Sequence, residues 1–71
     1  MPIDITAPIT GTIWKVEKGA GERVEAGEAI VILESMKMEI PVEAPRAGQI
    51  REMRCKAGQS VKEGQILALL D

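Results

Sequence analysis

The stretch Glu34-Ser35-Met36-Lys37-Met38-Glu39 lies near the middle of the 71-residue chain and places one lysine between two methionines. When the chain is shifted against itself by 37 positions, residues 1–34 align with residues 38–71 without a gap. The two segments agree far more often than chance allows. Identical pairs include Ala7 and Ala44, Pro8 and Pro45, Gly11 and Gly48, Ile13 and Ile50, Gly21 and Gly58, Val24 and Val61, Gly27 and Gly64, and Leu33 and Leu70. The chain is therefore a tandem duplication, and residues 35–37 join its two copies.

The duplication constrains the architecture. Both copies should adopt the same local fold, and two such copies pack most simply about a pseudo-two-fold axis. Lys37 aligns with the position just before Met1, so the symmetry equivalent of the turn at Lys37 is the gap between the chain ends. We therefore expect Lys37 at one extreme of the molecule and both termini at the other.

The composition predicts one small domain, residues 1–71, with an aliphatic core. A chain of this length buries roughly 60 % of its unfolded surface. It has no Phe or Tyr and a single Trp, Trp14, so isoleucine, valine and leucine must supply the core. The β-branched residues among these favour strands.

Charge and cysteine content narrow the functional classes. A net charge of −2 with interspersed signs argues against a nucleic-acid surface, which needs a basic patch. Cys55 is the single cysteine, so no internal disulfide asks for an oxidising compartment. No apolar run approaches the ~20 residues of a membrane span, and the N-terminus lacks the features of a signal peptide. We expect a soluble cytoplasmic protein.

The hydrophobic pattern predicts strands throughout. Residues 3–6 and 38–43 alternate between apolar and polar side chains, and residues 11–16 form a less regular strand. The runs 29–33 and 66–70 are short, continuously apolar and rich in branched residues, which predicts strands buried on both faces.

Glycines separate these strands, and no helical period is sustained anywhere. Residues 17–22 read as a loop, and Val24 and Val61 each stand alone between two glycines, as pegs that would pin a loop to the core. The sequence therefore predicts an all-β fold, a pseudo-two-fold flattened barrel or sandwich of two similar sheets.

The joint between the copies is a candidate functional site. The flanking strands place a tight hairpin turn at Met36-Lys37, where positive φ angles usually select Asn-Gly or a similar pair. A turn that breaks this rule within an otherwise consistent sequence points to function, and two exposed methionines suit contact with a partner. The alternative is that Lys37 is one of nine basic residues and merely solvates a loop tip.

The residues Glu-Ser-Met-Lys-Met-Glu resemble the attachment signature of biotinyl domains, usually written Ala-Met-Lys-Met. The likeness spans the whole chain, and Ala44-Pro45, Gly48 and the glycine–valine run at residues 58–67 resemble the second half of that family. Lipoyl domains share the glycine–valine run. The resemblance implies a flattened β-barrel, a barrel-sandwich hybrid, with the modified lysine on an exposed hairpin.

The resemblance also implies a mechanism. A biotin protein ligase would attach biotin to the ε-amine of Lys37, and Met36 and Met38 would aid recognition. The lysine-bound biotin would carry carboxyl groups between the biotin carboxylase and carboxyltransferase components of a carboxylase. The chain itself would be a non-catalytic carrier, since it has no histidine and one cysteine from which to build a base or a metal site.

Three features depart from the family pattern. Ser35 stands where alanine is commonest, the loop at residues 17–22 has no room for an inserted thumb, and an Ala/Pro-rich linker is missing. These features fit a free-standing small carrier or an excised domain, and the start at Met1 favours the free-standing form.

Two other functions stay open. A lipoyl carrier has a similar fold and a modified hairpin lysine, but its signature is typically Asp-Lys-Ala, and Met36 and Met38 occupy those flanking places here. The other alternative is an unmodified β-barrel interaction module. An enzyme in its own right has no residues to support it.

Overall fold

A computed structural model describes all of residues 1–71 and contains eight strands and no helix. No helix is therefore available to cross a membrane. All five strands expected from the sequence are present. The strands are β1 (Ile3–Thr6), β2 (Gly11–Val16), β3 (Arg23–Val24), β4 (Ala29–Ser35), β5 (Met38–Glu43), β6 (Gly48–Met53), β7 (Ser60–Val61) and β8 (Ile66–Leu70).

The strands form two antiparallel four-stranded sheets with equivalent topology. One sheet has the order β1-β8-β6-β3 and the other the order β5-β4-β2-β7. Moving from one copy of the repeat to the other converts β1 into β5, β8 into β4, β6 into β2 and β3 into β7, so each sheet maps onto the other. Each sheet contains strands of both copies, so neither copy completes a sheet by itself. The predicted all-β, pseudo-two-fold sandwich is confirmed.

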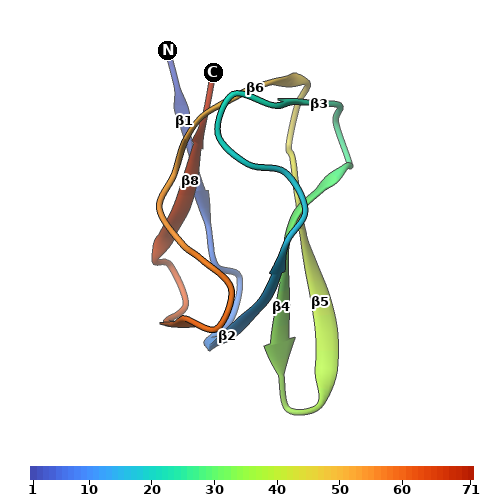
Figure 1. The fold of residues 1–71 in the computed structure, drawn as a ribbon, viewed down its shortest axis with the longest axis vertical. Coiled ribbons are helices and arrows are strands. Elements are labelled where there is room, and N and C mark those ends of the chain that lie inside the picture. Colours follow the sequence, from blue (N-terminus) through green and yellow to red (C-terminus); the bar gives the residue numbers. More distant parts are fainter.

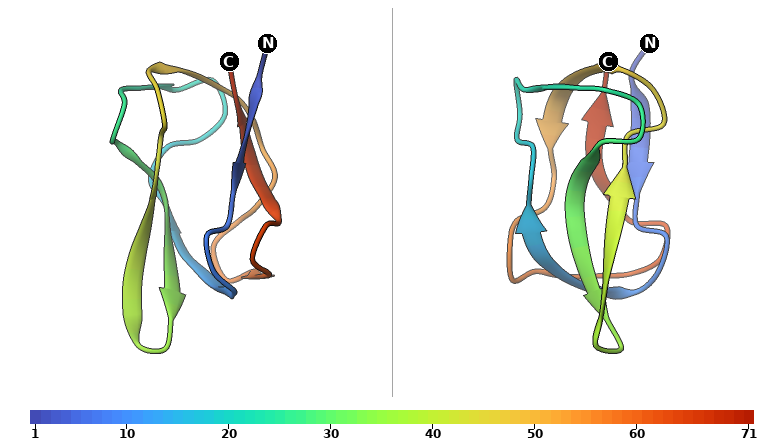
Figure 2. Two further views of the ribbon diagram at one scale, coloured as in Figure 1. Left: turned by 180° about the vertical axis from the view of Figure 1, so that it is seen from behind. Right: turned by 90° about the vertical axis from the view of Figure 1, so that its right-hand side faces the viewer.

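The molecule is elongated, with extents of 32 × 17 × 16 Å. The β4–β5 hairpin projects at one end of the long axis, and the N- and C-termini lie side by side at the other (Figure 1). Both turned views show the same separation (Figure 2). The placement expected from the duplication is thus what the structure shows, and it leaves the hairpin far from the chain ends.

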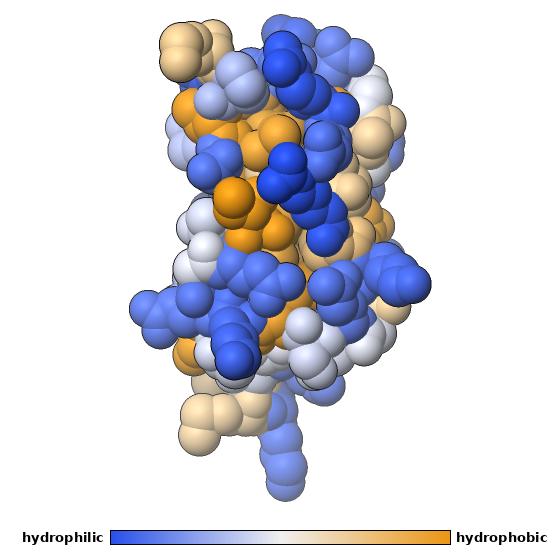
Figure 3. All heavy atoms as spheres, turned by 90° about the vertical axis from the view of Figure 1, so that its left-hand side faces the viewer, coloured by the Kyte–Doolittle hydropathy of each residue, from blue (hydrophilic) through white to orange (hydrophobic).

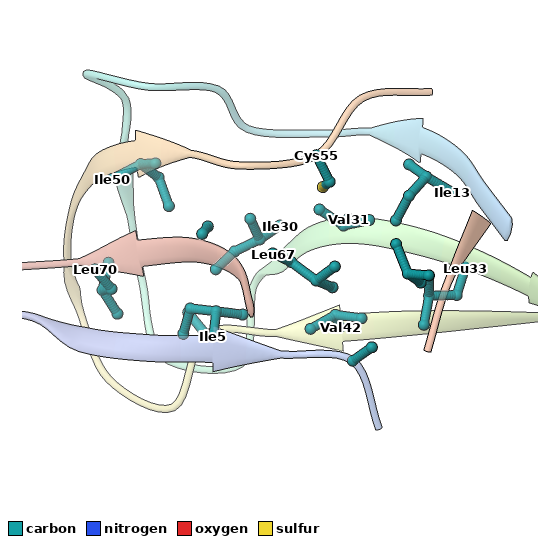
Figure 4. Packing of buried hydrophobic residues seen from close by; sticks show 14 of the residues in the cluster. Ile5, Ile13, Ile30, Val31, Leu33, Val42, Ile50, Cys55, Leu67 and Leu70 are labelled. Atoms are coloured by element: carbon teal, nitrogen blue, oxygen red, sulfur yellow. The ribbon is translucent and has the colours of Figure 1, made fainter. Parts of the chain in front are cut away.

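Between the sheets lies one aliphatic core, into which both copies project equivalent side chains (Figure 4). Seven pairs of repeat-related residues are buried, and Cys55 is the one buried residue without a buried counterpart. Trp14 stays outside the core, with 51 % of its surface exposed. The pairs are Ile5 and Val42, Ala7 and Ala44, Ile13 and Ile50, Val24 and Val61, Ile30 and Leu67, Val31 and Ala68, and Leu33 and Leu70.

The prediction that β4 and β8 are buried on both faces was wrong. Ile32 and its counterpart Leu69 are only half-buried, because a two-layer sandwich leaves the outer face of each sheet open to solvent. In β4 the pairing register with β5 shifts between Ala29 and Val31, and both Ile30 and Val31 are buried. A bulge of this kind makes a strand that is buried on one face look continuously apolar in the sequence.

Val24 and Val61 are buried as predicted, but each belongs to a two-residue strand instead of a loop. Their strands pair with β6 and β2, respectively. Cys55, the single cysteine, is part of the core and 8 % exposed. Burial raises the pKa of the Cys55 thiol, so its nucleophilic thiolate form is disfavoured.

Four tight turns of one design close the loops. In each turn the third residue is a glycine with φ between 84° and 90°, and the fourth N–H donates to the first carbonyl, as in a type II turn. The side chain of the fourth residue, Glu or Gln, accepts a hydrogen bond from the first N–H at 2.7–3.1 Å. The turns span residues 19–22, 25–28, 56–59 and 62–65.

Candidate functional site

The β4–β5 hairpin ends in a two-residue turn made of Met36 and Lys37. Ser35 pairs with Met38, and the two residues between them have φ angles of 52° and 67°. Positive φ at both central residues defines a type I′ turn, the turn expected for a two-residue hairpin. Residues with a Cβ disfavour this region by about 1–2 kcal/mol each. The turn is therefore locally strained, and it lies at the two residues where the sequence predicted a tight turn.

The turn exposes all three residues of its Met-Lys-Met sequence. Met36 is 88 % exposed and Met38 64 % exposed, and Lys37 is also exposed. The Nζ amine of Lys37 takes part in no ion pair and no side-chain hydrogen bond. In the space-filling view the hairpin projects below the body, with pale apolar atoms beside blue hydrophilic ones (Figure 3). The structure thus presents a free primary amine between two flexible apolar side chains.

Lys37 differs from the other four lysines of the chain. Lys15 and Lys18 form ion pairs with Glu17 and Glu28, each with a nitrogen–oxygen distance of 3.3 Å. The remaining two, at positions 56 and 62, are the first residues of type II turns in the body of the molecule. Only Lys37 combines an unpaired amine with a position at the tip of a projecting hairpin.

Glu34 and Glu39 lie directly opposite each other next to the closing pair of the turn, and both are exposed. Like charges facing across an antiparallel pair are mildly destabilising. Neither carboxylate forms an ion pair with Lys37. The site therefore offers an amine nucleophile without a bound base to deprotonate it.

The body of the molecule supports the hairpin from β2 and the segment before it. A Cβ added to Gly11 would lie 2.6 Å from the carbonyl oxygen of Glu34, so only glycine allows β2 to approach β4 this closely. The Ser35 hydroxyl donates a hydrogen bond of 3.0 Å to the carbonyl of Thr10. The sequence reasoning missed Thr10. No sequence signal marked this contact, because its acceptor is a main-chain carbonyl, which every residue carries.

Comparison with known proteins identifies the family. A family model described as biotin-requiring enzyme, the biotin and lipoyl attachment family, matches residues 1–70. The chain belongs to this family. A Biotin/lipoyl attachment protein of Bacillus subtilis is 44 % identical over 89 % of this chain and 86 % of its own length. The biotin carboxyl carrier protein of acetyl-CoA carboxylase from Solanum lycopersicum is 41 % identical over 94 % of this chain and 97 % of its own length.

Solved structures share the fold. Urea carboxylase of Kluyveromyces lactis matches all of this chain with a TM-score of 0.94 and 31 % identity, over 6 % of its own length. The lipoyl domain of the 2-oxoglutarate dehydrogenase complex from Azotobacter vinelandii matches 97 % of this chain and 95 % of its own length, with a TM-score of 0.82 and 35 % identity. Both comparisons agree with the barrel-sandwich architecture that the family resemblance implied.

The geometry of the hairpin fits covalent attachment of a carboxylic acid cofactor. The exposed amine can form an amide bond without first breaking an ion pair. The lysine stem, with its four methylene groups, then adds reach beyond a hairpin that already projects from the body. Met36 and Met38 can repack against an approaching partner because their side chains are unbranched and flexible.

Proposed function

We propose that Lys37 is the attachment site for biotin and that residues 1–71 act as one carrier domain. The chain is a biotin carrier domain, not an enzyme in its own right, and it serves a biotin-dependent carboxylase. One observation carries the assignment of the site. Lys37 is an exposed, unpaired lysine held in a strained hairpin turn at the end of the molecule farthest from its termini.

Attachment requires a partner that supplies both activated biotin and a base. A lysine amine is protonated at neutral pH and becomes a nucleophile only after losing a proton. The neutral Nζ of Lys37 then attacks the activated carboxyl carbon of biotin, and a C–N amide bond forms as the activating group leaves. The nitrogen releases its second proton to the same base. We assign this work to a biotin protein ligase, because the hairpin has no group placed to do it.

Met36 and Met38 would provide the apolar contacts by which the ligase recognises the turn. Their exposure leaves both side chains free to enter a partner surface. When bound, biotin supplies a ring that accepts a carboxyl group at one active site and gives it up at another. We propose biotin carboxylase and carboxyltransferase components as those partners, and a cytoplasmic location, since the single cysteine needs no oxidising compartment.

The test is the intact mass of Lys37→Arg protein after incubation with a biotin protein ligase, biotin and ATP. We expect the wild type to gain one biotinyl group and Lys37→Arg to gain none, since arginine keeps the charge but lacks an acylatable amine. Lys62→Arg is the matched control, because it makes the same change at another exposed lysine and should be labelled normally. A biotinyl group on Lys37→Arg protein would refute the site.

Lipoylation is the second candidate, favoured by the structural likeness to the lipoyl domain. A parallel incubation with a lipoate ligase, lipoate and ATP distinguishes the two cofactors by mass. We expect little lipoyl transfer, because Met36 and Met38 replace the residues that flank the lysine in the lipoyl signature. A wild-type protein that accepts lipoate and refuses biotin would keep the hairpin as the site and change its cofactor.

A further inference from the structure

We propose that Ser35 and Thr10 are positioning residues that fix the lysine hairpin to the body of the domain and so decide how Lys37 meets its enzymes. The proposal rests on the assignment of Lys37 as the attachment site. It concerns the orientation of the hairpin, which the family signature does not address.

Two hydrogen bonds meet at Thr10 and join three segments that are distant in the sequence. The Ser35 hydroxyl donates to the Thr10 carbonyl at 3.0 Å, and the Glu63 backbone N–H donates to the Thr10 hydroxyl at 3.0 Å. Thr10 lies in the loop between β1 and β2, and Glu63 lies in the turn that follows β7. The hairpin is thereby tied through Thr10 to a loop held by backbone hydrogen bonds, including that from the Gly64 N–H to the Ala7 carbonyl at 2.8 Å.

This connection lies where the pairing of β4 runs out. The last residue of β4 that pairs with β2 is Glu34, opposite Thr12, whereas Ser35 pairs only with Met38. Beyond Glu34 the hairpin is thus a two-stranded ribbon, an arrangement that is marginally stable in water. The facing carboxylates of Glu34 and Glu39 weaken it further. The Ser35 hydroxyl therefore lies where the hairpin leaves the sheet, and its hydrogen bond restrains movement of the turn relative to the body of the domain.

The pseudo-two-fold symmetry provides an internal control. Backbone bonds that build the scaffold occur in equivalent pairs, such as Gly64 N–H to the Ala7 carbonyl and Gly27 N–H to the Ala44 carbonyl, each 2.8 Å. The two hydrogen bonds at Thr10, which together we call the tether, have no such equivalent. At the other end of the molecule the Ser35 bond has no counterpart, because position 35 lies in the joint and aligns with no residue of the other copy. The Glu63 bond has none because Thr10 corresponds to Ala47, which has no hydroxyl to accept a hydrogen bond. The scaffold forms there without the tether, so the tether is specific to the end that carries the lysine.

The first experiment compares Ser35→Ala with Ser60→Ala, the same change at the only other serine of the chain, whose side chain makes no hydrogen bond. A net hydrogen bond corresponds to roughly a fivefold change in equilibrium. We expect amide hydrogen exchange of Met38, which pairs with Ser35, to become about fivefold faster in Ser35→Ala and to stay unchanged in Ser60→Ala. Exchange in the core strands should be the same in both variants.

The second readout is ligase kinetics. A hairpin that spends less time in the competent orientation raises the apparent dissociation constant in proportion. The competent fraction can fall by no more than the change in that equilibrium, so we expect the KM of a biotin protein ligase for Ser35→Ala to rise by at most about fivefold, with kcat unchanged. Ser35→Thr restores a hydroxyl in a residue type that suits a strand, and should return both exchange and KM towards wild type.

Thr10→Ala removes the acceptor of the Glu63 N–H while keeping the Thr10 carbonyl that receives the Ser35 bond. Thr10→Ala should therefore raise hydrogen exchange at the hairpin and the KM of the ligase, but less than Ser35→Ala does. In the double variant, the increase in each quantity should be smaller than the sum of the two single-variant increases. Wild-type exchange and KM in Ser35→Ala would overturn the proposal, as would exchange that accelerates equally throughout the domain. Hydrogen exchange needs no biotin, so this outcome is independent of whether Lys37→Arg is labelled.

Discussion

Five turns of this protein contain residues with positive φ, and they use different residues to achieve it. Four turns place glycine there, at positions 21, 27, 58 and 64. The fifth, at the tip of the β4–β5 hairpin, uses Met36 and Lys37. The four glycine turns hold loops against the sandwich, whereas the fifth projects from it and exposes Met36 and Lys37 to solvent.

The difference separates turns that serve the fold from the turn that we propose carries the attachment site. A glycine adopts positive φ at little steric cost, so it is the expected choice where a turn serves only the fold. A methionine and a lysine in the same conformation cost stability, and such strain is found most often at functional sites. The hairpin turn carries side chains at positive φ where the scaffold turns have glycine, which supports a role for the side chains themselves.

The largest effect within this comparison is expected from Gly21→Ala. Gly21 has a φ of 88°, and no neighbouring atom lies within 4 Å of the position that an added methyl group would take, so the cost is that of the backbone alone. We expect a loss of about 1–2 kcal/mol in unfolding free energy, measured by urea denaturation. Gly19→Ala in the same turn is the control, because Gly19 lacks a positive φ. Equal losses in the two variants would show that conformation is not what selects glycine.

A smaller effect of opposite sign is expected at the hairpin. Met36→Asn places a residue that tolerates positive φ in the first position of the turn. We expect a gain of about 0.5–1 kcal/mol in unfolding free energy, accompanied by slower biotinylation because a side chain proposed to contact the ligase is lost. Met38→Asn, within β5, should slow biotinylation without the gain in stability. A destabilised Met36→Asn protein would show that the turn is not strained at this position.

The smallest expected effect is on the pH dependence of stability. It concerns the fourth residues of the four glycine turns, which are glutamates in the first copy and glutamines in the second. The Glu25 backbone N–H and Lys18 lower the pKa of the Glu28 carboxyl from its ordinary value of 4.5. A lowered folded-state pKa stabilises the fold above pH 4.5, and that contribution disappears as pH falls through the folded value. Glu28→Gln keeps an acceptor for the Glu25 N–H and loses the charge.

Thermal unfolding of wild type and Glu28→Gln between about pH 3 and pH 6 measures that contribution. The melting temperature of Glu28→Gln should fall slightly less on acidification than that of the wild type. Glu22→Gln is the control, since Glu22 also accepts a turn N–H but has no ion-pair partner. A Glu28→Gln curve parallel to the wild-type curve over this range would contradict the assigned cause.

Much of the architecture could be predicted because it depends on local pattern and on the repeat. The alternating residues at 3–6 and 38–43 became edge strands of the two sheets, and the edge position of β5 accommodates Pro41, which has no N–H to donate. The hairpin tip, its positive φ angles and its distance from the termini followed from the joint at residues 35–37. The apolar runs at 29–33 and 66–70 became strands, although not strands buried on both faces.

The features that sequence reasoning missed depend on contacts between distant residues. Val24 and Val61 could be recognised as buried, but only the pairing of β3 with β6 and of β7 with β2 makes them strands. Cys55 aligns with Lys18, which makes a surface ion pair, so the repeat gave no sign that the thiol enters the core. Nothing local links Ser35 to Thr10, which lie 25 positions apart.

The sequence by itself determined the duplication, the order of the strands along the chain and the position of Lys37 at a turn opposite the termini. These properties follow from residue type and spacing, which set backbone conformation locally and repeat it in the second copy. Only the tertiary structure decided which apolar residues face solvent, where Cys55 lies and what anchors the hairpin. Such properties arise when the two sheets pack, because burial and side-chain hydrogen bonds depend on neighbours that the chain brings together from distant positions.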